Sequence, residues 1–232
     1  MTYFNLPSTS IGDEELPDSL EKPIDNELQE LMPGLLKATL LLHWANRTDW
    51  FFGRSMGIYY DLEKPPLVAD GFLSLGVERA PYEDLRYSYV LWDEKVIPSL
   101  VLEVVARNYY NYEYTTKLEQ YDQLAIPYCV IYSPRRRRRP RLEIYKLING
   151  HYELQSGNPV WLPEIGLGIG SERGNYCGVT REWLYWYDEN GKRYPTPEEQ
   201  ILKLQEQVQF AEQRAQKLAE KLQELGVDAD QI

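Results

Sequence analysis

The sequence is poor in cysteine and histidine, and it lacks any long apolar run. Its two cysteines, Cys129 and Cys177, have no CxxC pattern or nearby histidine, which argues against a zinc site and favours two reduced thiols. The two histidines, His43 and His151, show no ligand spacing. No stretch approaches the about 20 apolar residues that span a bilayer, and the first residues lack the pattern of a signal peptide. We therefore expect a cytoplasmic protein without a membrane segment.

The formal net charge of -11 at first argues against a nucleic-acid partner. The excess of acids, however, lies in the two ends of the chain. Residues 1–30 contain eight acids and one lysine, and residues 196–232 contain eight acids and four bases. Residues 31–195 contain 20 acids and 20 bases, so the body of the protein is neutral and can still present a basic face.

Length and composition predict one main folded domain with appendages. The chain has 232 residues, 43% of them hydrophobic, and its 19 tyrosines and 6 tryptophans are typical of a packed core. Residues 1–23 combine prolines with acids and serines, which predicts a flexible acidic arm. We expect the core domain to span residues 24–195 and a separate tail to span residues 196–232.

Helical and strand patterns alternate along the core, which predicts an α/β fold. Residues 25–47 have apolar residues near helical spacing, interrupted by Pro33 and Gly34, so we expect a short helix and then a longer one. Asn149 and Gly150 predict a hairpin turn. The remaining expected elements are strands at residues 67–77, 87–92, 98–105, 128–132, 142–147 and 152–154, and a helix at residues 114–125.

The tail has an unbroken heptad pattern. Eight apolar residues are spaced alternately three and four apart, with Glu, Gln and Lys between them: Ile201, Leu204, Val208, Ala211, Ala215, Leu218, Leu222 and Leu225. This predicts a coiled-coil helix that associates with a second copy as a homodimer. The alternative is an amphipathic helix that folds back on its own domain.

Two acids within apolar strand patterns are the strongest indication of chemistry. Glu103 interrupts a nearly continuous apolar run, and a buried carboxylate without a partner costs several kcal/mol. Asp70 lies in the preceding strand pattern. If the two strands are neighbours, both carboxylates can share a divalent cation such as Mg²⁺, with Mn²⁺ as an alternative. Such a cation polarises a phosphoryl oxygen and lowers the pKa of a bound water, and a nearby lysine would stabilise charge.

Several motifs resemble the Uma-type family of restriction endonucleases. The family pattern is P-D-L-V-x-E-V, then a helix with K-L-x-x-Y, then V-P-x-Y. The chain has similar stretches at Pro98–Val104, Lys117–Tyr121 and Ile126–Tyr128. Later stretches and the coiled-coil tail are similar to one subgroup: Trp161-Leu162-Pro163-Glu164, Gly166-Leu167-Gly168, Gly178-Val179-Thr180-Arg181 and Trp186-Tyr187-Asp188. The likeness covers about residues 25–225.

The resemblance implies a PD-(D/E)XK nuclease fold, a restriction-endonuclease-like mixed sheet flanked by helices. It also implies a magnesium-dependent hydrolysis of DNA. Asp70 and Glu103 match the two metal-binding acids of the family. The superfamily's usual lysine position falls on Val105, and in this family the lysine is on the following helix, where Lys117 matches.

Each candidate residue also has a purely structural interpretation. Glu103 could be a carboxylate paired inside the sheet, Asp70 could cap a turn with Gly71, and Lys117 could be a solvated helix lysine. Tyr121 shares a helix face with Lys117 and could only pack the core. Two acids of the first helix, Glu27 and Glu30, could add a metal contact or simply be exposed.

A dense run of arginines lies between two prolines. The run could contact the phosphate backbone of DNA, or it could be the solvated tip of a hairpin. Its members are Arg135, Arg136, Arg137, Arg138 and Arg139, with Arg141 just beyond.

Two functions from different classes therefore remain. The first is a metal-dependent DNA endonuclease. The second is a catalytically weakened or inactive nuclease fold that acts as a scaffold and binds partners through its coiled coil. Three departures from the family pattern support the second function: Ser99 for aspartate, Ala69 for proline, and Arg107-Asn108-Tyr109 for Ser-Pro-Ser.

Overall fold

A computed structural model of the chain describes residues 26–79, 85–105, 116–136 and 140–225. The chain divides into two compact units, Met1–Tyr194 and Pro195–Ile232. The expected acidic arm, residues 1–23, lies outside the described residues.

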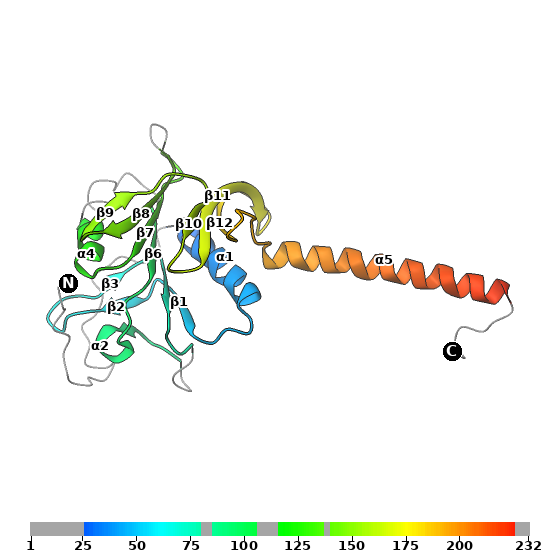
Figure 1. The fold of residues 1–232 in the computed structure, drawn as a ribbon, viewed down its shortest axis with the longest axis horizontal. Helices are drawn as coiled ribbons and strands as arrows, with labels where there is room; N and C mark the ends of the chain where they lie inside the picture. Colours follow the sequence, from blue (N-terminus) through cyan, green and yellow to red (C-terminus); the bar gives the residue numbers. More distant parts are fainter. Residues whose placement is uncertain (1–25, 80–84, 106–115, 137–139, 226–232) are drawn as a thin grey trace. The chain divides into compact units, whose positions relative to one another are not determined.

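The first unit is built on a six-stranded mixed sheet (Figure 1). Strands β6 and β7 are parallel, and the other neighbours are antiparallel. A parallel pair needs a crossover connection, which here carries a helix. In spatial order the strands are β1 (Trp50–Arg54), β4 (Gly71–Leu75), β6 (Leu100–Val104), β7 (Tyr128–Tyr132), β8 (Leu142–Ile148) and β9 (His151–Leu154).

Two three-stranded sheets accompany the central sheet. One is an antiparallel meander of β10 (Val160–Leu162), β11 (Leu167–Tyr176) and β12 (Val179–Tyr187). The other has the order β3 (Leu67–Val68), β2 (Gly57–Tyr59) and β5 (Tyr89–Val90). The described residues also form four helices: α1 (Glu27–His43), α2 (Leu91–Glu94), α4 (Leu118–Gln123) and α5 (Pro197–Glu224). None of these helices is long and apolar enough to cross a membrane.

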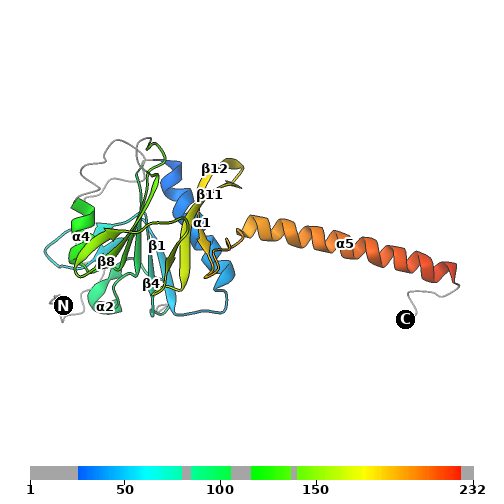
Figure 2. The same cartoon turned by 45° about the horizontal axis from the view of Figure 1, so that its top comes forward.

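Strand β6 separates two apolar layers. All five of its residues are buried, as the apolar run predicts for a strand covered on both faces. Leu100, Leu102 and Val104 pack into the layer formed with α1 and β10–β12. Val101 packs into the layer formed with α4, β5 and β7. Figures 1 and 2 both show α1 and α4 on opposite sides of the sheet. Glu103 alternates with the first group and therefore faces the α4 side.

Helix α1 corrects one expectation, because it continues through Pro33 instead of breaking there. Asn26 caps its start by accepting hydrogen bonds from the backbone N–H groups of Leu28 and Gln29. Proline removes one backbone hydrogen bond inside a helix. The burial of Pro33 against the sheet offsets that loss and keeps the two predicted helices as one.

Other strand expectations were partly right. The hairpin between β8 and β9 is confirmed, and both Asn149 (φ 52°) and Gly150 (φ 82°) have the positive φ values that a two-residue turn of this type requires. The strand expected at residues 67–77 is divided into β3 and β4 by a bend at Asp70. The strand expected at residues 87–92 is limited to β5, because helix α2 begins at Leu91.

The two-layer core makes a direct prediction about stability. Leu102→Ala is expected to lower the free energy of unfolding by about 2–5 kcal/mol, because Leu102 is fully buried and its truncation leaves a cavity. The matched control is Leu154→Ala on edge strand β9, where the side chain is 56% exposed and the change should stay within about 0.5 kcal/mol. Urea unfolding measures both. Equal losses in the two variants would contradict the layer assignment.

Candidate active site

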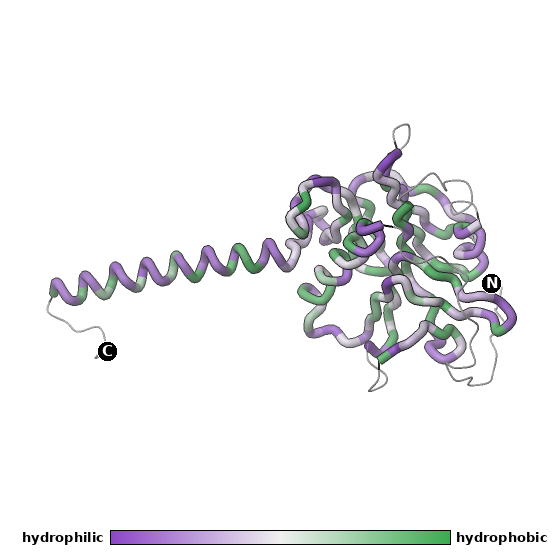
Figure 3. Tube along the Cα trace, turned by 180° about the vertical axis from the view of Figure 1, so that it is seen from behind, coloured by the Kyte–Doolittle hydropathy of each residue, from purple (hydrophilic) through white to green (hydrophobic). Residues whose placement is uncertain are grey.

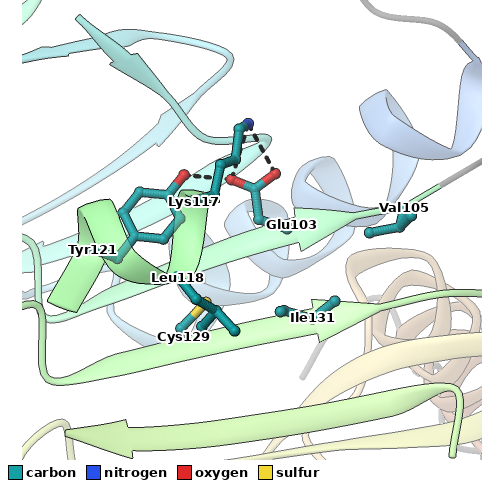
Figure 4. Close-up of a pocket in the computed structure, with 7 residues that line it drawn as sticks. All are labelled: Glu103, Val105, Lys117, Leu118, Tyr121, Cys129 and Ile131. Atoms are coloured by element: carbon teal, nitrogen blue, oxygen red, sulfur yellow. Dashed lines mark hydrogen bonds and ion pairs between the residues drawn. The ribbon is translucent and has the colours of Figure 1, made fainter. Parts of the chain in front are cut away.

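The crossover between β6 and β7 places two polar side chains of one helix over β6. Parallel strands β6 and β7 are joined through α4, so the helix runs back across the sheet. Lys117, at the N-terminal end of α4, and Tyr121 are four residues apart and share a helix face. Both face Glu103 (Figure 4).

Glu103 is the centre of this cluster. The Lys117 Nζ atom donates to both carboxylate oxygens, at 3.3 Å from Oε1 and 3.2 Å from Oε2. The Tyr121 hydroxyl donates to Oε1. Lys117 Nζ also donates to the carbonyl oxygen of Val68 in β3, at 2.9 Å. The amine therefore joins three elements, β3, β6 and α4, at one point.

Burial makes the ion pair necessary. Glu103 is only 6% exposed, and an ionised carboxylate at this depth costs several kcal/mol unless a cation and hydrogen bonds compensate it. The Lys117 side chain is 15% exposed, so this partner of the pair is partly accessible to solvent. The pair is thus a partly accessible charge site at the end of an otherwise apolar strand.

Asp70 lies beside the same end of β6. In the β4–β6 register Gly71 is opposite Leu102, and one further residue along this register corresponds to Asp70 opposite Glu103. The Asp70 Oδ2 atom accepts a hydrogen bond from the backbone N–H of Val104 at 2.6 Å. This is the peptide group that directly follows Glu103. The Asp70 carboxylate therefore contacts β6 at the residue next to Glu103.

Helix α1 supplies a further contact to Asp70. The Gln29 Nε2 atom donates to Asp70 Oδ1 at 3.4 Å. Gly71 permits the close approach of this helix, since a Cβ atom there would lie 3.2 Å from both Pro33 Cβ and the Phe52 ring. The carboxylate of Asp70 is thus oriented from two sides, by a β6 amide and by an α1 amide side chain.

A small pocket opens at this cluster. Its cavity volume is about 10 Å³, roughly the space for one water molecule and far below that of pockets that enclose small organic ligands. It can accept a single water or one phosphate oxygen. The lining residues are Glu103, Val105, Lys117, Leu118, Tyr121, Cys129 and Ile131 (Figure 4).

Cys129 does not add a nucleophile to the pocket. Burial raises the pKa of the Cys129 thiol well above its ordinary value, and the nearby Glu103 carboxylate raises that pKa further. Only the thiolate is an effective nucleophile or metal ligand. The polar chemistry of the pocket is therefore limited to the carboxylate, the amine and the phenol.

The donor set is compatible with a hard divalent cation. Among the described residues, no group of three or more His, Cys, Asp and Glu side chains is placed to hold a metal ion. Mg²⁺ does not need such a group, because it is usually bound by one or two carboxylates and keeps several waters. Asp70 and Glu103 are two carboxylate residues opposite one another in the β4–β6 register, and a carboxylate has roughly four acceptor sites, so contact with an amine does not prevent coordination.

The arginine-rich turn is partly committed to contacts within the chain. Arg136 forms an ion pair with Glu143, with 2.6 Å between Nη1 and Oε1 and both side chains nearly buried. Arg141 lies 3.8 Å from an acid of β12, and Arg135 is exposed. Residues 137–139 lie outside the described residues. Arg136 is thus a structural residue of the β7–β8 connection.

Sequence reasoning selected three of the five polar side chains gathered here. It named Asp70, Glu103 and Lys117, and it left Tyr121 as a residue that could only pack the core. Tyr121 is fully buried, yet its hydroxyl contacts the carboxylate. The spacing of four from Lys117 was a signal for that role. Gln29 was missed, because nothing in a helix of this composition indicates contact with a strand 41 residues away.

The Glu103–Lys117 pair can be tested by its effect on folding. Lys117→Met is expected to lower the free energy of unfolding by about 3–5 kcal/mol, because the buried carboxylate loses its cation. The double variant Glu103→Gln/Lys117→Met should recover most of that loss, since no charge is then buried. Urea unfolding of the single and double variants gives the interaction free energy between Glu103 and Lys117. Additive losses would show that the pair does not interact in solution.

Comparison with known proteins agrees with this geometry. A family model described as "Putative restriction endonuclease" matches residues 20–172, a range that contains Asp70, Glu103 and Lys117. The comparison with curated proteins gave no match. The match covers more than half of the chain and confirms the family resemblance, and the likeness of residues 173–225 to one subgroup stays a prediction. The mixed sheet with its flanking helices fits the restriction-endonuclease-like fold. The chain therefore belongs to the Uma2 family.

Proposed function

We propose that this protein is a magnesium-dependent endonuclease that hydrolyses phosphodiester bonds of DNA. Its family is described as one of restriction endonucleases, which indicates nuclease activity. The observation that carries the finer proposal is the convergence on one strand end of two acids and an amine: Asp70, Glu103 and Lys117.

In this proposal Asp70 and Glu103 hold the cation. When bound, Mg²⁺ or Mn²⁺ would polarise a phosphoryl oxygen and lower the pKa of a water molecule. The contact from Val104 N–H and the contact from Gln29 orient the Asp70 carboxylate beside the end of β6. Restricting the rotation of a ligand side chain before the cation arrives improves affinity, as with outer-sphere partners of other metal ligands.

Lys117 and Tyr121 have separate roles in this proposal. The Lys117 amine lines the pocket, where it can stabilise the negative charge that develops on the phosphate. Tyr121 is fully buried and its hydroxyl contacts Glu103, so we assign it a positioning role. Its hydroxyl holds the Glu103 carboxylate in one orientation beside the amine.

The scaffold function remains the second candidate, and the departures from the family pattern bear on it unequally. Ser99 lies four residues before Glu103, so about 13 Å of strand separates the two positions. Ala69 is buried in the apolar layer next to Asp70. The substituted stretch at residues 107–109 lies outside the described residues. The Ser99 departure therefore gives little support to loss of the site.

We also propose that α5 pairs with a second copy of the chain. The helix begins with a capping box between Thr196 and Glu199, and its 28 residues give a length of about 42 Å. Apolar residues recur along it between polar ones (Figure 3). A single helix has nothing to pack its seam against, and none of its residues is buried, as at Leu204 (49% exposed) and Leu218 (57% exposed). A homodimeric coiled coil would bury this seam.

The proposed activity also leads us to expect a cellular location. A DNA substrate and two free cysteines, Cys129 and Cys177, are consistent with the cytoplasm, where thiols stay reduced.

The nuclease proposal is tested by nicking of supercoiled plasmid in the presence of Mg²⁺ or Mn²⁺. Asp70→Asn, Glu103→Gln and Lys117→Met are each expected to lower the nicking rate at least about 100-fold, because each removes a ligand or a stabilising charge. The matched control is Glu119→Gln, an exposed acid on the same helix as Tyr121, which should keep the wild-type rate.

A second readout separates activity from folding. Mn²⁺ should raise the melting temperature of the wild type and of the Glu119→Gln control, and it should not raise that of Glu103→Gln. A wild type that neither nicks plasmid nor responds to either cation would reject the enzyme and support the scaffold function.

The association proposal is tested by sedimentation of the full chain. Leu204→Lys places a charge in the seam and is expected to convert the dimer to a monomer at micromolar concentration. The matched control is Leu202→Lys, which changes an exposed leucine outside the seam and should leave the dimer intact. A wild-type monomer would favour the alternative in which the helix folds back on its own domain.

A further inference from the structure

Three basic side chains follow edge strand β1. Strand β1 is the outer strand of the central sheet and pairs only with β4 in that sheet. Arg79 lies at its start, with its guanidinium 5.2 Å from the centre of the Trp50 ring. The Lys37 amine, from α1, lies 5.9 Å from the centre of the Phe51 ring. Arg54 is the last residue of β1. We call these three residues the β1 cation row.

None of the three cations has an acid within 4.0 Å among the described residues. Arg54 and Arg79 are exposed, and Lys37 is half-buried. Burial lowers the pKa of Lys37, and repulsion from Arg54 and Arg79 lowers it further, so the three charges act on one another. Uncompensated cations of this kind raise the local positive potential and attract polyanions. The row is therefore a basic strip on a domain whose charges balance overall.

Two acids near the row are already paired with other cations. Asp49, just before β1, accepts from Arg47, with 3.1 Å between Oδ2 and Nη2. Glu94 forms an ion pair with Arg86, and both side chains are nearly buried. Glu78, which directly precedes Arg79, is exposed. Neither Asp49 nor Glu94 therefore serves as a counter-ion of the row.

Arg86 also fixes the segment that carries Arg79. Its Nη1 atom donates to the Arg79 carbonyl oxygen at 2.8 Å, and its Nη2 atom donates to the carbonyl oxygen of Glu78. The guanidinium lies 4.6 Å from the centre of the Phe51 ring. The backbone N–H of Arg79 donates to Thr48 at 3.1 Å. Arg79 is thus held at the start of β1 before any ligand binds, which reduces the entropy cost of binding.

The row leads to the candidate active site. Arg54 is opposite Gly71 in the β1–β4 register, and Gly71 directly follows Asp70. The backbone N–H of Ser55 donates to the Asp70 carbonyl oxygen at 3.3 Å. From Trp50 to Arg54 the strand rises about 13 Å. This span is long enough for the row to lie beside more than one phosphate of a DNA strand.

We propose that Lys37, Arg54 and Arg79 bind the phosphate backbone of DNA and guide it along β1 to the Asp70 and Glu103 carboxylates. The row lies beside those acids, so the guidance of DNA to them rests on the proposed nuclease function. Arg136 of the arginine-rich turn is committed to Glu143, so that residue is not part of the proposed phosphate contact.

Binding of the full chain to DNA tests the row without cleavage. The probe is a fluorescein-labelled 20-base-pair duplex in EDTA, and anisotropy is measured over a series of salt concentrations. Arg54→Gln/Arg79→Gln is expected to weaken binding at least about tenfold and to reduce the slope of log K against log salt by about 2, since each phosphate contact contributes about 0.9. Melting temperature serves as the folding check, because both arginines are exposed.

The matched control removes the same charge from another surface. Arg173→Gln/Lys192→Gln changes two exposed cations of the β11–β12 sheet and its following turn, and it should keep the wild-type affinity within about twofold. Equal weakening in both double variants would overturn the row, since net charge alone would then explain it. Loss confined to Arg135→Gln/Arg141→Gln, or no binding by the wild type, would overturn it as well.

The result is independent of whether the protein cuts DNA. The row variant keeps Asp70, Glu103 and Lys117, and the Glu103→Gln variant keeps the row. If DNA binding depends on the row while wild-type nicking is absent, the phosphate contact stands and the nuclease function fails. If the wild type nicks DNA and the row variant binds and nicks it equally well, the nuclease function stands and the row is wrong.

Discussion

The buried charge of Glu103 is the constraint on which the site depends. Strand β6 is apolar on both faces, and this composition places it at the centre of the sheet. An ionised acid can occupy such a position only with a cation and hydrogen bonds beside it. Lys117 and Tyr121 supply them from α4, so the crossover helix is required by the chemistry of one side chain in the strand below it. The site is therefore assembled only when α4 is docked on β6.

Much of the fold could be predicted because its signals are local. The buried strands β6 and β7 are continuous apolar runs, and the turn at Asn149 and Gly150 requires only two positive φ values. Pro33 misled the prediction of α1, since helix breaking depends on whether burial offsets a lost hydrogen bond. The bend at Asp70 corresponds to the turn with Gly71 that the sequence left open as an alternative. The early start of α2 was missed, because it depends on contacts with other elements.

The candidate site could be predicted in part for the same reason. An acid in an apolar run and a lysine four residues before a tyrosine can be recognised in the sequence alone. The family resemblance then assigned them to one site. The contact between Gln29 and Asp70 depends on how α1 lies against β4. The β1 cation row was likewise invisible, because its members come from a helix, a strand and a loop. The arginine-rich turn was the more obvious basic feature, yet Arg136 is used internally.

Helix α4 has only six residues, and helices shorter than about 12 residues are marginal in water. Its helical state depends on the docking of Tyr121 and Leu124 into the apolar layer. A transient local opening of this segment would carry the ammonium group away from Glu103 and leave the carboxylate to be hydrated. The protection of α4 amides against hydrogen exchange and the fraction of molecules with an assembled site are then two measures of a single equilibrium.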